Sequence, residues 1–437
     1  MRFYIETLGC PKNQVDSEMM ATLLDSEGHS QTQEPDQADV VIVNTCGFIG
    51  TARAESTQVL QELAQTKGAG QLLVAAGCMP QRYHGEILTS VPGVDALIGT
   101  QNWPEIVDLF RQLEQGAKPG QRPTHLEEAG RIVTSLPRQA TMGATAYLKI
   151  ADGCDAACGY CTIPLIKGPQ RSKTPQDIVR EARELDEEGV LELVLIAQDT
   201  TAYGRDLGQR DGLPNLLRRV AKAVPDMPWM RIMYAYPQHI TPRLVSAMAA
   251  LTPVCHYLDM PLQHGHADVL RRMRRPHDLD HVRDIIASLR DAMPDISLRS
   301  TFIVGYPGET EAEFEALLAF MEEIALDKVG VFAFSLEPDT YAATLPDQVP
   351  PEVIAERYDR AMRLQQEISL ACNQEQVGWQ MAVLIEGVGD GISVGRSYRD
   401  APEVDGLVLI EEELTVGRFY QVEIIGAEEY DLVGRLV

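Results

Sequence analysis

GCDAACGYC, residues 153–161, places Cys154, Cys158 and Cys161 at a C-x3-C-x2-C spacing directly after Tyr147–Ala151, a run typical of a strand. Three thiolates from one short loop can ligate three irons of a 4Fe–4S cluster and leave one iron without a protein ligand. That iron can chelate the amino and carboxylate groups of S-adenosylmethionine (SAM). Electron transfer from the cluster then breaks a carbon–sulfur bond and makes the 5′-deoxyadenosyl radical. The segment therefore predicts a radical-SAM centre.

A structural zinc site is the alternative interpretation of the same three cysteines. Zinc normally takes four closed ligands, often from paired C-x2-C motifs. No fourth Cys or His stands near residues 153–161 in the sequence, which favours the iron–sulfur interpretation.

The chain beyond this loop repeats a strand–helix pattern. Helical stretches such as Pro175–Glu188 and Thr310–Glu323 separate the apolar runs. Six βα units are too few for the eight-fold barrel but enough for an open, partial one. The predicted strands are Tyr147–Ala151, Leu191–Ala197, Met230–Ala235, Tyr257–Met260, Ser297–Val304 and Lys328–Phe334.

Residues at the ends of these strands are predicted to contact SAM. Gln198 ends the second strand in LIAQDT and can bond the methionine end. TFIVGYPGE, at the fifth strand, contains Gly305, Pro307 and Gly308. Its glycines let the backbone approach a ligand. Tyr160, inside the cysteine loop, completes the predicted set. An ordinary strand-end turn is the alternative for both strand-end motifs.

The first part of the chain predicts a parallel, doubly wound sheet. RFYIETLG, DVVIVNT and QLLVAAG are short apolar runs of the kind buried on both faces of a sheet. Helical stretches at Ser17–Ser26 and Thr51–Gln65 intervene, and the alternation of strand and helix favours α/β architecture.

Each of those three runs is followed by a cysteine: Cys10, Cys46 and Cys78. Ligands of parallel sheets bind beyond the carboxyl ends of the strands, so these side chains should converge. A single buried cysteine is ordinarily core filler. Three cysteines in equivalent positions predict a second three-cysteine cluster. Cys255 and Cys372 have no such partners and are interpreted as structural.

The predicted domains are 1–113, a linker 114–144, a barrel with a trailing helix 145–374, and 375–437. The last segment has short alternating runs separated by Gly, Asp and Ser, which predict a small all-β barrel. The expected fold class is α/β, with an N-terminal doubly wound sheet, a partial (βα)6 barrel and the terminal β-barrel.

The net charge of −26 argues against a large nucleic-acid footprint, because Lys and Arg dominate phosphate binding. It fits a basic protein partner, and an acidic protein that is simply soluble is the alternative. No apolar run approaches the roughly 20 residues that span a bilayer. The start lacks the pattern of a signal peptide, so we expect a cytoplasmic protein with no membrane partner and with reduced thiols.

Together these features resemble the radical-SAM methylthiotransferases over nearly the whole chain: an N-terminal methylthiotransferase domain, a radical-SAM core and a TRAM domain. The motifs are LGCPKNQVDSE, VNTCGFI, AGCMPQRY, GCDAACGYCTIPLIKGPQRS and STFIVGYPGET. Within the family, QDTTAYG, YAYPQHIT, YLDMPLQH and GRSYRDAPEVDG resemble the members that modify ribosomal protein S-twelve. One departure is Lys167-Gly168, where Arg-Gly is common.

The resemblance implies addition of a methylthio group to the β-carbon of one aspartate in that ribosomal protein. It implies two 4Fe–4S clusters held by the six cysteines, with SAM serving as radical source and methyl donor. A sulfur species associated with the N-terminal cluster completes the carbon–sulfur bond. Partners are then the basic ribosomal protein, an electron donor such as a flavodoxin or ferredoxin, and a sulfur donor. No general acid–base pair is evident, and the roles of His239 and His264 stay open.

The charge of the terminal segment separates the rival functions. Residues 375–437 hold 13 Asp or Glu against 4 Arg, a net charge of −9 that would repel phosphate. A tRNA methylthiotransferase is therefore the weaker alternative, and a non-catalytic iron–sulfur or zinc scaffold is the alternative of another class. Glu411, Glu412 and Glu413 would alternate between faces if they lie on a strand, or form a solvated acidic turn.

Overall fold

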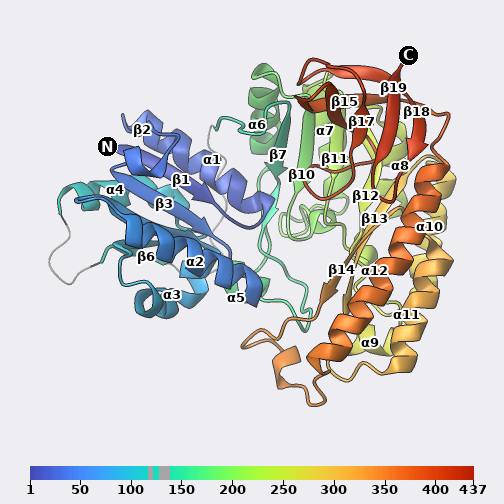
Figure 1. Cartoon of the computed structure of the whole chain (residues 1–437), viewed down its shortest axis with the longest axis horizontal. Helices are drawn as coiled ribbons and strands as arrows, with labels where there is room; N and C mark the ends of the chain where they lie inside the picture. The colour runs from blue at the N-terminus through green and yellow to red at the C-terminus, as the bar shows by residue number, and fades with distance from the viewer. Residues whose placement is uncertain (117–121, 127–137) are drawn as a thin grey trace.

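The computed structural model describes residues 1–116, 122–126 and 138–437, and its strands form two parallel six-stranded sheets, a closed barrel and one short two-stranded sheet (Figure 1). The predicted fold class, α/β with a terminal β-barrel, is confirmed. Part of the predicted linker, 117–121 and 127–137, lies outside the described residues. Within the rest of it, two residues form β6 (Thr124–His125).

The N-terminal sheet has the order β2-β1-β3-β4-β5-β6 and is parallel throughout. Helices α1 and α4 cover one face and α2 and α3 the other, so alternate residues such as Ile42 and Val43 are buried on opposite sides. The chain reverses direction across the sheet between β1 and β3, which makes the ends of these strands a ligand-binding position. The elements are β1 (Arg2–Thr7), α1 (Pro11–Ser26), β2 (Ser30–Gln31), β3 (Val40–Thr45), α2 (Gly50–Thr66), β4 (Leu72–Gly77), α3 (Cys78–Ser90), β5 (Ala96–Gly99) and α4 (Ile106–Glu114).

Helix α1 begins six residues before the predicted start at Ser17. Pro11 occupies the first turn, where the proline ring suits helical backbone and its missing N–H costs nothing. The early start makes Cys10 the N-cap and puts Lys12 and Asn13 in the first turn, against the sheet.

The second sheet has the order β14-β13-β12-β11-β10-β7, also parallel, and helices packed on its outer face complete the open (βα)6 barrel. Helix α12 packs along the edge strand β14, and α1 lies against β7 at the other edge (Figure 1). The elements are β7 (Thr145–Lys149), α6 (Pro175–Glu187), β10 (Glu192–Ile196), α7 (Gly212–Ala223), β11 (Trp229–Ile232), α8 (Pro242–Ala250), β12 (Val254–Asp259), α9 (Ala267–Arg272), α10 (Leu279–Ala292), β13 (Ser297–Val304), α11 (Glu311–Ile324), β14 (Lys328–Ala333) and α12 (Pro351–Gln374).

The C-terminal strands close into a barrel in the order β15-β16-β17-β19-β18. Its core is a separate cluster of aliphatic side chains, among them Val383, Ile410 and Ile424. The strands are β15 (Gln380–Gly389), β16 (Ile392–Ser397), β17 (Val408–Ile410), β18 (Phe419–Ala427) and β19 (Leu432–Leu436). Among the described residues, no helix combines the length and the apolar character needed to cross a membrane.

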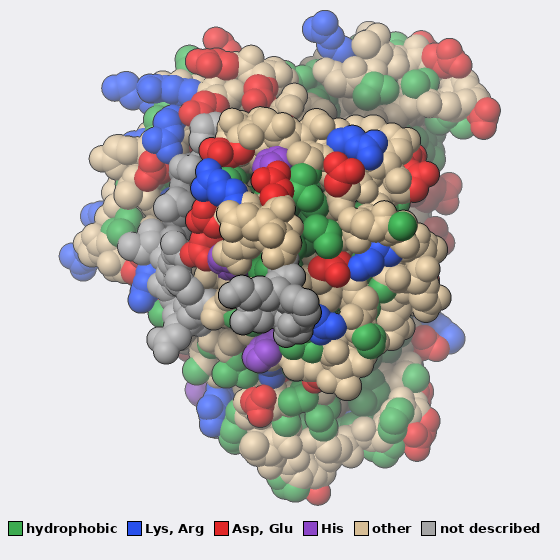
Figure 2. Space-filling model, turned by 90° about the vertical axis from the view of Figure 1, so that its left-hand side faces the viewer, with side chains coloured by type: hydrophobic (Ala, Val, Ile, Leu, Met, Phe, Trp, Pro, Cys, Tyr) green, Lys and Arg blue, Asp and Glu red, His purple; other side chains and the backbone are tan. Residues whose placement is uncertain are grey.

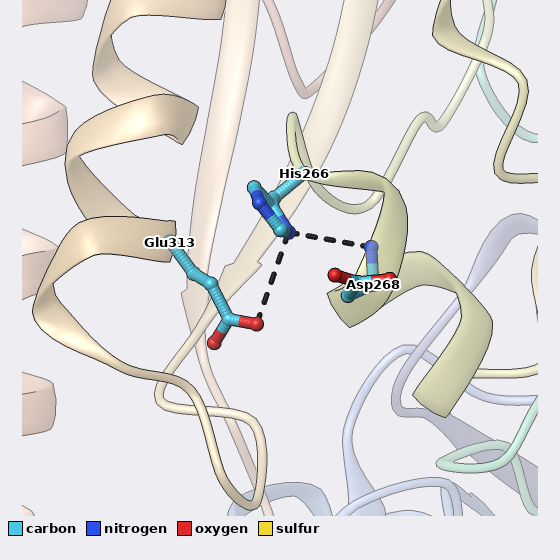
Figure 3. A group of neighbouring side chains, drawn as sticks. All are labelled: His266, Asp268 and Glu313. Carbon is cyan, nitrogen blue, oxygen red and sulfur yellow. Dashed lines mark hydrogen bonds and ion pairs between the residues drawn. The ribbon is translucent and has the colours of Figure 1, made fainter.

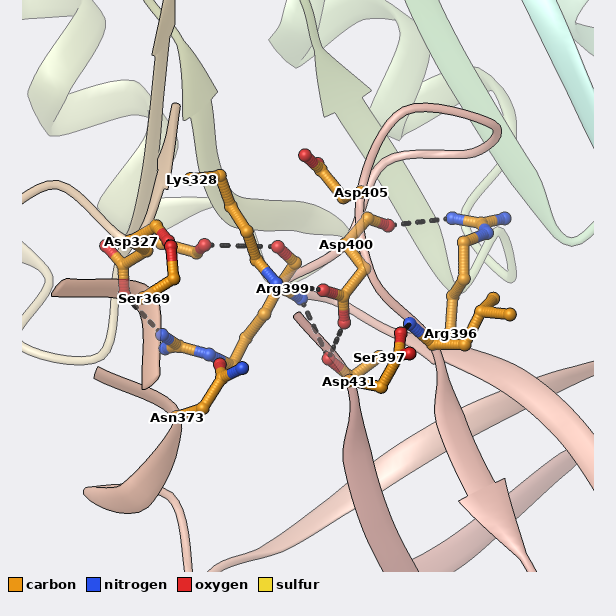
Figure 4. Close-up of polar contacts among 12 residues, drawn as sticks. Asp327, Lys328, Ser369, Asn373, Arg396, Ser397, Arg399, Asp400, Asp405 and Asp431 are labelled. Atoms are coloured by element: carbon orange, nitrogen blue, oxygen red, sulfur yellow. Dashed lines mark hydrogen bonds and ion pairs between the residues drawn. The ribbon is translucent and has the colours of Figure 1, made fainter. Parts of the chain in front are cut away.

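Buried ion pairs connect this barrel to residues at the starts of strands in the second sheet (Figure 4). Asp400 lies 2.8 Å from the Lys328 ammonium, and Arg399 pairs with Asp327. Arg396 lies 2.6 Å from the carboxylate of Glu192, the first residue of β10. These contacts come from GRSYRDAPEVDG, residues 395–406, so this motif forms the joint between the two units.

We predict that Arg396→Ala lowers the free energy of unfolding by about 3–5 kcal/mol, because Glu192 is then buried with one cation fewer. Arg435→Ala in the same barrel is the control: its pair with Glu423 is exposed and contributes less than about 1 kcal/mol. Denaturant unfolding of both variants measures the difference. Equal losses for the two arginines would contradict the assignment of Arg396 to the joint.

Candidate functional site

Cys10, Cys46 and Cys78 stand at the carboxyl ends of β1, β3 and β4, and the fold brings them together. Cys10 and Cys46 flank the point where the order of the sheet reverses. Gly9 has a φ of 94°, and a Cβ there would lie 2.7 Å from the Cβ of Cys46, so glycine permits the approach. Burial raises the pKa of Cys46 to about 11 and that of Cys78 to about 12, and each of these pKa values also responds to the thiol of Cys10.

Asn13 ties the three cysteine loops to one another. Its amide nitrogen donates to the carbonyl oxygens of Leu8, at 2.9 Å, and Thr45, at 3.1 Å. Its Oδ1 lies 3.9 Å from the Cys78 sulfur, within reach of an S–H donor. Sequence reasoning missed this residue, and its only signal is its place in the first turn of a helix capped by a cysteine.

The second trio lies in the loop after β7 and the two-residue strand β8 (Ala151–Asp152). The backbone N–H groups of Ala156 and Ile163 donate to the sulfurs of Cys154 and Cys161, each at 3.4 Å. The Arg275 guanidinium lies 3.7 Å from the Cys158 sulfur. Burial raises the pKa of Cys154 to about 11 and that of Cys161 to about 12, whereas the two backbone N–H donors favour the thiolate form that a metal requires.

The sulfurs within each trio are too far apart for the geometry of a single zinc ion. A tetrahedral zinc ion with Zn–S distances of about 2.3 Å holds its sulfurs about 3.8 Å apart. In neither trio do all three sulfur atoms lie within 4.8 Å of one another. All six cysteines are free thiols, as a set of cluster ligands requires.

The residues predicted to contact SAM line the end of the sheet near the second trio. The Gln198 amide nitrogen donates to Asp152 at 2.7 Å, while its buried Oε1 has no partner in the described part of the chain and can accept from a ligand amine. Burial, and next the neighbouring Cys158, raise the pKa of Tyr160 well above its ordinary value. Gly305 has a second reason to be glycine, because a Cβ there would lie 2.4 Å from Ile354 of α12. SAM contacts by Gln198, Tyr160, Gly305, Pro307 and Gly308 stay a prediction.

The structure indicates no catalytic role for His264 or His239, the two histidines whose roles the sequence left open. His264 is fully buried, and its Nδ1 accepts from the backbone N–H of His266 at 3.0 Å. His239 lies 2.8 Å from Asp199, a carboxylate whose charge reaches Cys154. Both contacts position loops at the strand ends.

His266, Asp268 and Glu313 form the one group of three potential ligand atoms within 4.8 Å among the described residues (Figure 3). The His266 ring accepts the backbone N–H of Asp268 and thereby caps α9. The Glu313 carboxylate is paired with Arg272 at 2.8 Å and closes the capping box of α11. These interactions account for the cluster without a metal ion.

Four buried charges lie between the two trios. Lys167 lies 2.9 Å from Asp152 and 3.7 Å from Asp16, and Lys149 contacts the same two carboxylates. Burial alone would lower the pKa of Lys167, but Asp152 and Asp16 raise it above its ordinary value. Asp16 belongs to α1 and the other three residues to the barrel. Lys167 stands where arginine is common in the resembling family, and it thus keeps the positive charge that Asp16 and Asp152 require.

Three family models match the chain in succession. They are the Uncharacterized protein family UPF0004 over residues 2–99, the Radical SAM superfamily over residues 148–321 and the TRAM domain over residues 377–437. The solved structure of the radical SAM methyltransferase TsrM from Kitasatospora setae shares the fold, with a TM-score of 0.60 and 12% identity over 84% of this chain and 89% of that chain. At this identity the likeness concerns the fold alone.

Two curated relatives match from end to end. The ribosomal protein uS12 methylthiotransferase RimO of Roseiflexus sp. (strain RS-1) is 50% identical over 100% of this chain and 97% of its own length. The RimO of Heliobacterium modesticaldum is 44% identical over 100% of this chain and 95% of its own length. Fold and site therefore define a radical-SAM methylthiotransferase. The chain belongs to the family of ribosomal protein uS12 methylthiotransferases named RimO, so the predicted resemblance is confirmed.

We predict that Asn13→Ala separates the three N-terminal loops. The change leaves buried carbonyl groups of Leu8 and Thr45 without this donor, at about 1–3 kcal/mol each. Iron content should fall by about one cluster, and the free energy of unfolding should fall by about 2–6 kcal/mol. Gln58→Ala, on the exposed face of α2, is the matched control. Iron analysis and denaturant unfolding identical to those of the control would remove Asn13 from the site.

Proposed function

We propose that this chain adds a methylthio group to the β-carbon of an aspartate in ribosomal protein uS12. The observation that carries the proposal is the pair of cysteine trios at the strand ends of two sheets, joined by one buried charge cluster. Residues 1–113 would form the methylthiotransferase domain, 145–374 the radical-SAM core and 375–437 the TRAM domain. The relatives carry the name of this activity over the same full length.

We infer that Cys10, Cys46 and Cys78 hold one 4Fe–4S cluster and that Cys154, Cys158 and Cys161 hold the other. When bound, the clusters and SAM supply the electron, the hydrogen-abstracting radical, the sulfur chemistry and the methyl group. The protein groups position them: N–H donors and Arg275 stabilise thiolates, and Gln198 offers a buried acceptor. A flavodoxin or ferredoxin as electron donor, a separate sulfur donor and a cytoplasmic location complete the proposal.

The two trios have separable roles under this proposal. Cys158→Ala removes a ligand of the SAM-binding cluster and should abolish formation of 5′-deoxyadenosine while the N-terminal cluster survives. Cys46→Ala should lower iron by about one cluster and block methylthiolated product, yet leave reductive SAM cleavage largely intact. Each variant is the control for the other, with iron analysis and product chromatography as readouts. Normal 5′-deoxyadenosine formation by Cys158→Ala would contradict the radical-SAM assignment, and unchanged iron in Cys46→Ala would return the first trio to a structural role.

We further propose that acidic groups of the C-terminal barrel attract the basic substrate protein. Glu411, Glu412 and Glu413 follow β17 in a bend, not on a strand, and all three are exposed. The barrel docks at the starts of the sheet strands, opposite the cysteines, so these carboxylates act by long-range attraction. On the face of Figure 2, by contrast, acidic and basic side chains intermingle. A solvated acidic turn with no partner is the alternative.

Changing Glu411, Glu412 and Glu413 together to Lys moves the charge of the segment 375–437 from −9 to −3. One exposed pair contributes only about 0.2–1 kcal/mol, so the triple change is needed. Association with uS12 should slow and its salt dependence should flatten, while SAM cleavage without substrate should not change. Stopped-flow association rates across a salt series provide the measurement.

The control carries the same change of net charge on α12, at the exposed Glu352, Glu356 and Glu367. If the control slows association as much as the barrel variant, net charge alone explains the effect. Wild-type rates and salt slopes in the barrel variant would eliminate acidic docking and leave the cluster chemistry untouched.

A further inference from the structure

Lys12 reaches from the N-terminal trio to the strand ends of the barrel. It lies in the first turn of α1, two residues after Cys10, and only 7% of it is exposed. Its Nζ lies 3.2 Å from the centroid of the Tyr234 ring, just beyond β11. Tyr234 has a φ of 64°, in the left-handed region, and its backbone N–H donates to Asp259 at 3.1 Å. A residue other than glycine adopts this backbone conformation only at a cost in free energy. The surrounding structure therefore holds the ring in place beneath the ammonium.

The Lys12 ammonium lacks a carboxylate partner among the described residues. Within residues 1–116, 122–126 and 138–437, its Nζ forms no hydrogen bond or ion pair. The neighbouring buried lysines, Lys149 and Lys167, are each paired with Asp16 and Asp152. Asp259, the carboxylate beneath Tyr234, is paired with Arg299 at 2.9 Å. Beyond the ring, Cys10, Asp259 and Asp152 act on the ammonium only through longer-range charge, and a buried cation so placed is costly unless an anion joins it.

The proposed function, on which this inference rests, defines what that anion must be. The reacting β-carbon of the substrate is one bond away from a side-chain carboxylate. The side chain must lie between the two trios, and Lys12 extends from the N-terminal trio to Tyr234 at the strand ends of the barrel. When bound, the open iron of the other cluster would take the carboxylate of SAM, which leaves Lys12 free for the substrate. Lysine suits the task, because its ammonium is a compact point charge with three donors on a flexible stem.

We propose that Lys12 binds the side-chain carboxylate of the substrate aspartate and thereby selects aspartate over asparagine. The carboxylate would complete the ion pair, and the Tyr234 ring would hold the ammonium in place. An asparagine amide is neutral and leaves the charge of Lys12 uncompensated, so it should bind more weakly. The residue is a substrate-binding group and is distinct from the cluster ligands.

The test uses full-length protein with both clusters and two synthetic uS12 peptides, one with the modified aspartate and one with asparagine in its place. Wild-type protein should bind the aspartate peptide at least about 30-fold more tightly, as expected when one partner of a buried charge pair is lost. Lys12→Met should lose this preference and bind both peptides alike. Lys12→Arg, which keeps the charge, should restore part of it. Anaerobic fluorescence anisotropy measures all six affinities.

Selective loss for the aspartate peptide in Lys12→Met, with partial recovery in Lys12→Arg, supports the proposal. An equal loss for both peptides, or no loss, overturns it and assigns Lys12 to packing on Tyr234. Equal binding of the two peptides by wild-type protein that still methylthiolates uS12 also overturns it. If wild-type protein modifies no uS12 at all, the proposed function itself fails, and the two failures are thereby distinguished.

Discussion

The structure depends on one interaction, the buried charge cluster of Asp16, Lys149, Asp152 and Lys167 between α1 and the barrel. Removing four charges from water is costly, and the cost is recovered only when opposite charges meet in good geometry. The N-terminal sheet can therefore dock in one position with all four charges paired, and a shifted position would leave a buried ion alone. Arg138, which pairs with Glu18 and Glu181, and Arg53, which pairs with Glu337, strengthen the same docking. The result is that loops bearing cysteines of the two trios are in contact, as where the Thr162 hydroxyl donates to the carbonyl oxygen of Phe48.

Polar joints recur at the other end of the barrel. Glu192 is buried between Arg231 and Arg396, and Arg299 is shared by Asp259 and Asp405. Arg299 thus connects the terminal barrel to the carboxylate that orients Tyr234, beside Lys12. Apolar clusters supply most of the core of each unit, whereas charged side chains fix how the units are placed. This division suits an enzyme whose reacting groups come from different domains.

Much of the fold was predictable because its signals are local. Apolar runs followed by helical patterns indicated both parallel sheets, and alternating runs indicated the barrel. The C-x3-C-x2-C loop and the three strand-end cysteines need only their own neighbours in the sequence to be recognised. The start of α1 was misplaced by six residues, and with it the first-turn positions of Lys12 and Asn13 were missed. The strand expected as one possibility at Glu411–Glu413 is a bend, because β17 ends at Ile410.

The sequence by itself determined the class of chemistry, the order of the three units and the six cysteines. It did so because spacing within a loop and position after a strand are properties of contiguous residues. Only the tertiary structure decided which polar residues support that chemistry. Asn13 bonds to loops up to 65 residues away, and Asp16 meets Lys149 across 133 residues. Among the described residues Lys12 forms no ion pair, whereas Asp16 and Asp152 pair with other lysines. Such pairings arise when distant segments pack, so no local pattern reports them.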